Sequence, residues 1–144
     1  MANVVPNAFK GELLSGTHNF ASGGDSFKLA LYTANPYTTS STAYSSGAGN
    51  EVSGSAPGYS TGGSALTSQA VASSTATASV DFANLTFSSA TFTAAFGAIY
   101  NDDKSDKLCV VLDFGGTKTA TNGDFVVQFP TASSSAAIIR LGNA

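Results

Sequence analysis

The chain has 144 residues, of which 42% are hydrophobic and only 10% are charged, against about 25% charged residues in a typical soluble domain. This length fits one domain spanning residues 1–144, and the hydrophobic content excludes a compositionally disordered chain. The net charge of −3 and the scattered positions of the six basic residues argue against nucleic-acid binding, which needs clustered Lys and Arg.

The cellular compartment is constrained by the cysteine content and by the first residues. Cys109 is the single cysteine, so an intrachain disulfide is excluded and synthesis in a reducing compartment is expected. Polar residues between Asn3 and Glu12 interrupt the apolar run that a signal peptide needs. No apolar stretch approaches the ~20 residues of a membrane helix, and we therefore expect no membrane segment.

The first predicted element is a helix over residues 7–15. Asn7 is a candidate N-cap, and Phe9, Leu13 and Leu14 are expected to lie on one face. Gly16 is expected to end the helix. About two turns are too short to persist alone, so this helix must dock on the core.

A strand and a long connection follow. Residues 26–33 alternate, with Phe27, Leu29 and Leu31 facing one way and Lys28, Ala30 and Tyr32 the other. Residues 34–65 are rich in Gly, Ser, Thr, Asn and Pro. A connection of this length inside one domain is usually functional, and short strands are expected within it at 37–44 and 50–53.

The remaining sequence predicts strands joined by turns. Gly97 marks a bulge or a close backbone approach, Gly115-Gly116 a chain reversal, and Asn122-Gly123 a tight hairpin. Leu108, Val110, Leu112 and Phe114 are expected to share a face. The expected strands are 66–72 and 76–82 (a hairpin around Ser73-Ser74), 84–87, 91–101, 107–114, 117–121, 125–129 and 136–141.

About eight or nine strands with one N-terminal helix indicate an all-β fold. The alternation of apolar and polar residues favours an antiparallel sheet with a half-buried face. We therefore predict a single antiparallel β-sandwich of jelly-roll or immunoglobulin-like type.

Few residues are candidates for chemistry. His18 is the only histidine, and no nucleophile motif such as G-x-S-x-G accompanies it, so a turn histidine is the favoured interpretation. Cys109 lies in a predicted strand between apolar neighbours and is expected to be a buried structural thiol.

The acidic segment 101–106 offers oxygens for Ca²⁺ but lacks the Gly and Glu of an EF-hand loop, so an ordinary turn is favoured. The carboxylates of Glu12, Glu51, Asp81 and Asp113 show no spacing that selects a catalytic pair. The Gly-rich stretch 54–63 lacks the Gly-Lys-Ser/Thr ending of a phosphate loop.

Four tyrosines are candidates for a carbohydrate-stacking face, although the chain has no Trp, the usual large platform. They are Tyr32, Tyr37, Tyr44 and Tyr59. The residues therefore assign no catalytic, cofactor-binding or metal-binding site, and an enzyme is not expected.

Several short phrases occur in a characteristic order. They are Phe-Lys-x-Glu-Leu-Leu-x-Gly (9–16), Phe-Lys-Leu-Ala-Leu-Tyr-Thr (27–33), Asn-Glu-Val-Ser-Gly (50–54), Gly-Tyr-Ser-Thr-Gly-Gly (58–63), Val-Asp-Phe (80–82), Ala-Thr-Phe-Thr-Ala (90–94), Gly-Ala-Ile-Tyr-Asn-Asp (97–102), Leu-Asp-Phe-Gly-Gly (112–116) and Ile-Ile-Arg-Leu (138–141). Over nearly the whole chain this set resembles small virion structural proteins of tailed bacteriophages.

The resemblance implies a capsid decoration (cement) protein that binds the major capsid protein lattice on the virion surface after synthesis in the host cytoplasm. Residues 7–15 and 34–65 are expected to contact the partner, because neither is needed to close a sandwich. A homo-oligomer would cover edge strands. The alternatives are a tail, collar or fibre component, and a carbohydrate-binding module for host attachment.

Overall fold

The computed structural model describes residues 3–142 and has an all-β, sandwich-like fold with two antiparallel sheets and one short α-helix. Its elements are α1 (Asn7–Leu14), β1 (Phe27–Tyr32), β2 (Ser64–Ala65), β3 (Ala70–Ser74), β4 (Thr77–Asp81), β5 (Leu85–Asn101), the 3-10 helix η1 (Asp102–Lys104), β6 (Lys107–Val127) and β7 (Ile139–Gly142). One sheet has the strand order β2-β1-β5-β6 and the other β3-β4-β7. The predicted fold class is confirmed.

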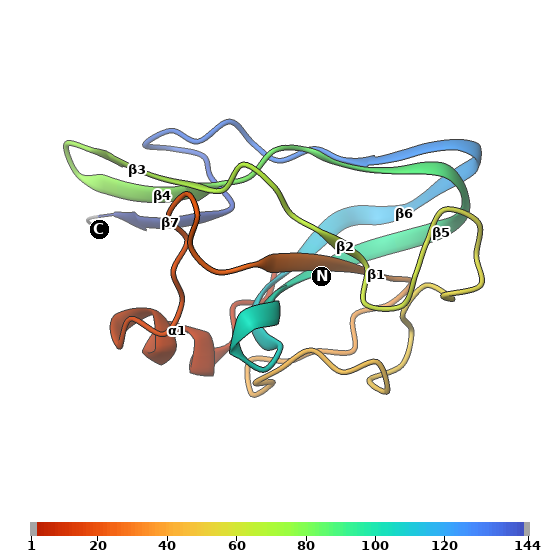
Figure 1. Cartoon of the computed structure of the whole chain (residues 1–144), viewed down its shortest axis with the longest axis horizontal. Helices are drawn as coiled ribbons and strands as arrows, with labels where there is room; N and C mark the ends of the chain where they lie inside the picture. Colours follow the sequence, from red (N-terminus) through yellow and green to blue (C-terminus); the bar gives the residue numbers. More distant parts are fainter. Residues whose placement is uncertain (1–2, 143–144) are drawn as a thin grey trace.

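The described residues form seven strands, because predicted strands merge into β5 and β6. These two strands pair along a ribbon that runs from Leu85↔Val127 to Asn101↔Lys107 and is interrupted by four register shifts. Figure 1 shows the ribbon curving back at one end, so its two halves lie in different layers. Bulges permit this bend because each adds a residue to one strand and kinks it.

Two predicted chain reversals are wrong for this reason. Ala94 pairs with Lys118 and Phe96 with Asp113, so Gly115 and Gly116 sit in a bulge of β6 and not in a turn. Asn122, with a φ of +50°, lies in a second bulge opposite Thr91. The reversal between β5 and β6 occurs instead at η1.

A smaller bulge changes the faces predicted for 107–114. Ile99 pairs with Val110 and Tyr100 with Leu108, so Cys109 is the extra residue. Leu108 therefore packs on the outer side of the sheet with Val111, while Val110 joins the main core. The prediction that Leu108 and Val110 share a face is wrong.

Gly97 does mark a close approach. A Cβ at this position would lie 3.0 Å from the Phe114 ring and 3.4 Å from Leu29. The β3–β4 hairpin is also confirmed, with its turn at 75–76 and not at Ser73-Ser74.

α1 docks through Phe9, which is buried, and ends at Leu14, one residue earlier than predicted, with Ser15 as the C-cap and the predicted stop Gly16 directly after it. The Gly16 and Thr17 amides donate to the carbonyls of Leu13 and Glu12, the pattern of a Schellman cap. Asn7 is the first helical residue and Pro6 the N-cap, so the predicted Asn7 cap is wrong. Among residues 3–142, no helix has the length and apolar character needed to cross a membrane.

Leu14 is 88% exposed and does not share the buried face. At 3.6 residues per turn it lies roughly 140° around the helix from Phe9, whereas Leu13 lies close to the same side. The predicted face is therefore correct for two of its three residues.

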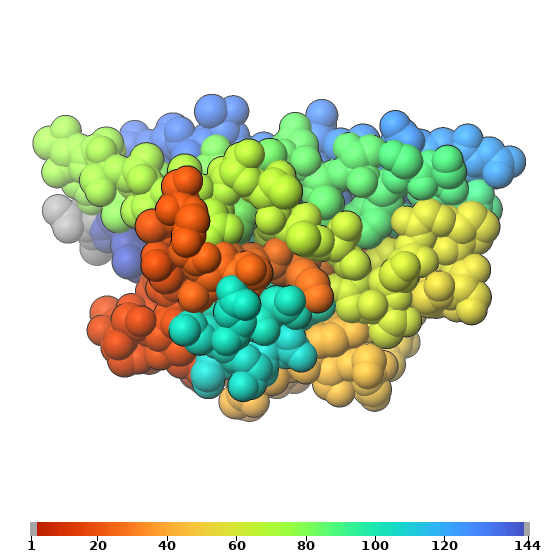
Figure 2. All heavy atoms as spheres, viewed as in Figure 1, coloured from red at the N-terminus to blue at the C-terminus, as the bar shows by residue number. Residues whose placement is uncertain are grey.

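The connection between β1 and β2 covers the outer face of the four-stranded sheet (Figures 1 and 2). It contains no strand of its own, only isolated bridges from Glu51 to Tyr32 and from Ala43 to Lys107. Its own residues Tyr37, Val52 and Tyr59 are buried, Tyr37 in a second core on this face of the sheet and Val52 and Tyr59 in the main core. The expectation that 34–65 is dispensable for the fold is wrong, because this segment closes a second core.

β1 is consequently buried on both sides. Phe27, Leu29 and Leu31 face the main core between the layers, and Ala30 and Tyr32 face the second core under the connection. The predicted phase of this strand is confirmed, and the connection explains why its second face is apolar.

We expect Gly63→Ala to destabilise the fold by at least about 3 kcal/mol. Gly63 has a φ of +76°, and a Cβ there would lie 1.8 Å from the carbonyl oxygen of Leu29 in the central strand β1. Urea unfolding measures the loss. The matched control is Gly49→Ala, where φ is +85° but no atom lies within 4 Å, so only about 1 kcal/mol of backbone strain is expected. Equal losses for the two variants would contradict the steric argument.

Candidate functional site

His18 lies at the centre of a buried polar network that joins α1 to the β5–β6 turn. Its Nε2 is 3.0 Å from Glu12 Oε2, and its Nδ1 is 3.0 Å from Asn101 Nδ2. Asn101 uses its oxygen to accept from the Asp103 amide, so its nitrogen is the donor to His18. The imidazole therefore accepts at Nδ1 and donates from Nε2 to Glu12.

The rest of the network consists of one ion pair and one hydrogen bond to a carboxylate. Lys107 Nζ lies 2.5 Å from Glu12 Oε1, and Asn101 Nδ2 donates to Asp25 Oδ2 at 2.9 Å. Burial raises the pKa of the Glu12 carboxyl, but hydrogen bonds from Lys107 and His18 outweigh it and leave the pKa below its usual value. His18 packs between the rings of Phe9 and Phe20. These contacts assign His18 a structural role, because none of them is to the hydroxyl or thiol group that a catalytic histidine would activate.

A second network surrounds Glu51 under the long connection. Its carboxylate accepts from the hydroxyl groups of Tyr44 (3.0 Å) and Tyr59 (2.7 Å) and from the Gly62 amide (2.7 Å). The Tyr100 hydroxyl donates to the Gly62 carbonyl, and its ring stacks on Tyr44 with centroids 4.4 Å apart. The Gly-rich stretch 54–63 thus directs an amide at a carboxylate of its own chain.

The tyrosines do not form the predicted stacking face. Tyr32, Tyr37 and Tyr59 are at most 5% exposed, and the Tyr32 and Tyr37 hydroxyl groups bond each other at 2.9 Å. Burial is the largest cause that raises the pKa of Tyr32 and of Tyr59 above the usual value. A sugar ring cannot reach these three faces.

The other candidates also have structural roles. The Cys109 thiol is buried in its bulge, and burial raises its pKa, so the prediction of a buried thiol is confirmed. In the turn at 101–106, Asp102 pairs with Lys28 and Asp103 accepts from the Ser26 amide. Within residues 3–142 no group of three His, Cys, Asp or Glu side chains is arranged to hold a metal.

The four carboxylates from which a catalytic pair was considered each have a separate set of partners. Glu12 and Glu51 belong to the two networks above, and Asp81 accepts from the Phe82 amide next to it. Asp113 accepts from the Gly115 amide in the bulge, which lowers its pKa.

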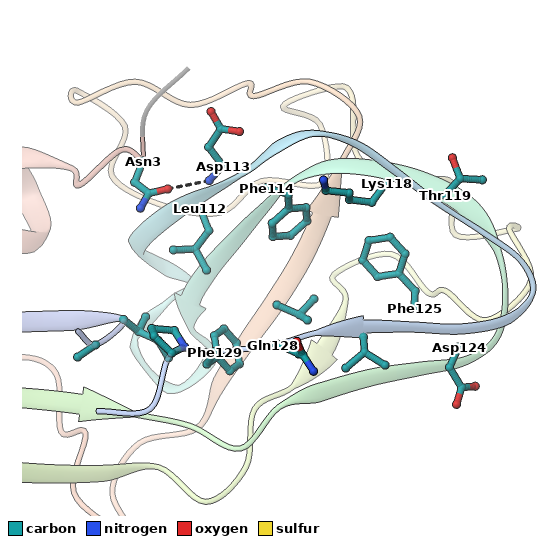
Figure 3. A pocket seen from close by; sticks show the side chains of 15 residues that line it. Asn3, Leu112, Asp113, Phe114, Lys118, Thr119, Asp124, Phe125, Gln128 and Phe129 are labelled. Carbon is teal, nitrogen blue, oxygen red and sulfur yellow. Dashed lines mark hydrogen bonds between the residues drawn. The ribbon is translucent and has the colours of Figure 1, made fainter. Parts of the chain in front are cut away.

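A groove opens between the two layers along β6, with a volume of about 690 Å³. The outer and returning halves of β6 form its two sides, and the segment before β7 forms its end (Figure 3). Its apolar lining consists of half-buried and buried side chains from these segments: Leu112, Phe114, Phe125, Val127, Phe129 and Ile138.

The polar side chains at the groove are not arranged for catalysis. Asp113 and Asp124 lie at opposite ends and point away from the apolar lining (Figure 3). Lys118 lies between them on the rim. The groove therefore offers an apolar surface with a polar border.

The backbone beside the groove is an edge strand, since β6 is the last strand of its sheet. Val4 pairs with Val111, and the Asp113 amide donates to Asn3 Oδ1, so the N-terminal segment covers the first half of this edge. No strand within the described part of the chain pairs with the outer side of the second half.

The sequence did not predict this groove. Phe114 and Phe125 were assigned to separate strands on either side of a supposed reversal at Gly115-Gly116, whereas the bend of the ribbon brings their rings to 6.3 Å. The apolar residues on both sides of the Gly-Gly pair were the sequence feature that could have indicated the groove.

Comparison of the chain with family models, curated proteins and solved structures found no match.

We expect the stability of the fold to fall as the pH drops below 4.5, the ordinary pKa of a Glu side chain. The lowered pKa of folded Glu12 means that its contribution is complete above the unfolded-state value and is lost as the pH falls through the folded-state value. Glu12→Gln is expected to cost about 1–2 kcal/mol at neutral pH and to flatten this pH dependence. Urea titrations across the acidic range measure both effects; parallel pH profiles for wild type and variant would refute the assignment.

Proposed function

We propose that the chain is a non-enzymatic structural protein of a virion, a capsid decoration protein that binds the major capsid protein lattice. The observation that carries a protein-binding role is the apolar groove beside the uncovered half of the β6 edge. The sequence resemblance supplies the class of partner.

The groove favours an extended polypeptide as its occupant. The backbone groups of an uncovered strand edge bond most completely to another strand, and alternate side chains of that strand would then enter the groove. Its lining of three Phe rings and three aliphatic side chains suits apolar residues. An exposed loop or arm of the shell protein meets both requirements.

Low charge supports the same role. The chain has nine acidic and six basic residues, so a neutral surface of Ser, Thr and backbone groups can approach another protein with little desolvation of charge. A protein that binds only the assembled lattice stabilises it by mass action, which is how a decoration protein would strengthen a shell.

Two contact regions proposed from the sequence need revision. Residues 34–65 contribute side chains to both cores, so a change in this segment would disturb the fold as well as any partner contact. The exposed Leu14 of α1 is expected to lie outside the contact, because the surface we propose for it is the groove. A carbohydrate-binding role loses support because three of the four candidate tyrosines are buried and the fourth, Tyr44, stacks on Tyr100.

The test is binding of the labelled protein to particles of the phage that encodes it. We expect a signal over the whole shell by cryo-electron microscopy. A signal at a single vertex would indicate a tail or collar component, and no bound protein would refute a virion role.

We expect Phe129→Arg to weaken shell binding by about tenfold or more, because a charge would enter the apolar groove. The matched control is Leu14→Arg, which adds the same charge at a site that is 88% exposed on α1 and should leave affinity close to that of the wild type. Sedimentation of shells with bound protein measures occupancy, and urea unfolding verifies that both variants are folded. Loss of binding in Leu14→Arg alone would place the contact on the helix instead of the groove.

A further inference from the structure

The three-stranded sheet has an edge that lacks the usual protection. β3 is an end strand, and all five of its residues are exposed. Its sequence, Ala-Val-Ala-Ser-Ser, contains no charge, proline or glycine. Proteins commonly block exposed edges with charged residues, proline or bulges, because such edges pair with other strands.

The other sheet edges in the described part of the chain are different. β2 has only two residues, and the first half of the β6 edge is covered by the N-terminal segment. β7 carries Arg140, whose guanidinium donates to the Ser134 carbonyl, and β6 carries Lys118 and Asp124. Among the four end strands of the two sheets, β3 is the one that has at least five residues and no charged side chain.

β3 is also regular. Its residues pair with β4 in five consecutive positions without a register shift, from Ala70↔Asp81 to Ser74↔Thr77. Its backbone is therefore extended along its whole length and can bond a second strand on its free side.

The apolar face of this sheet continues past the core. Val71 pairs with Val80 and Leu141 with Ala78, so these side chains lie on one face of the sheet. Val80 is buried, whereas Val71 is 53% and Leu141 55% exposed. Figure 2 shows this end of the molecule projecting beyond the rest.

We propose that β3 pairs with β3 of a second copy of this chain in an antiparallel, two-fold arrangement. Full overlap of the two strands places Ala72 opposite its own copy and Val71 opposite Ser73 of that copy. The two three-stranded sheets then form one continuous sheet. Each exposed Val71 side chain is partly covered by the neighbouring strand of the other copy.

Charge favours a second copy as the occupant. A charged residue at the axis of such a two-fold pairing would face its own copy, and like charges directly opposite each other are destabilising. β3 has no charged residue at any position, so no register of self-pairing opposes like charges along this strand.

Sedimentation velocity of the purified chain over a concentration series tests this pairing without any capsid. We expect a dimer of twice 14.4 kDa, and we expect Ala72→Lys to raise the dimer dissociation constant by at least about tenfold, because the two added charges face each other. The control Thr121→Lys adds the same charge on the exposed face of β6 and should dimerise as the wild type does. A monomeric wild type, or an unchanged Ala72→Lys dimer, would overturn the proposal.

Cross-linking tests the register directly. Ala72→Cys should form an intermolecular disulfide on mild oxidation, since opposed residues of antiparallel strands lie within disulfide reach. Thr121→Cys should not form an intermolecular disulfide. The native Cys109 is buried, so the wild-type chain gives the background level of cross-linking. A dimer without this cross-link would exclude the proposed register. Because neither experiment contains shells, failure here is independent of the decoration role.

Discussion

The bend in the β5–β6 ribbon is the constraint on which the other features of this protein depend. Strands of 17 and 21 residues are too long to lie flat over a core of this size, and bulges at Gly115-Gly116 and Asn122 allow them to fold back. The two halves of one ribbon thereby face each other across Phe92, Phe125 and Phe114. The same bend leaves β6 at the border of both layers, and the groove is the space between its two halves.

The polar side chains that resemble functional groups instead hold loops to this ribbon. Glu51 fixes the long connection by accepting three hydrogen bonds, and Asn101 with His18 fixes the ribbon's turn to α1. Buried polar groups need such partners, because an unpaired one costs free energy. These polar side chains are therefore occupied by hydrogen bonds within the chain, to its side chains and its backbone.

The two surfaces that we propose for binding other molecules differ in kind. The groove along β6 combines apolar rings with a strand edge, which suits an inserted segment of another protein. The β3 edge is uncharged and regular, which suits pairing with itself. They lie on different sheets, so a dimer formed through β3 would present two grooves, and two weak contacts with a repetitive lattice can act as one stronger contact.

The sequence by itself determined the local preferences: the all-β class from alternating apolar residues, the end of α1 just before Gly16, the phase of β1, and the buried thiol of Cys109. These features follow from the order of apolar, polar and glycine residues along short segments, so they can be predicted from the sequence. Tertiary structure decided whether Gly115-Gly116 and Asn122-Gly123 reverse the chain or form bulges, because β5 supplies the pairing partner that keeps β6 continuous. It also decided which side of the sheet Leu108 faces and that Tyr37 and Tyr59 of the connection are buried. The groove belongs to this second class, since its sides come from residues brought together by the bend of the ribbon.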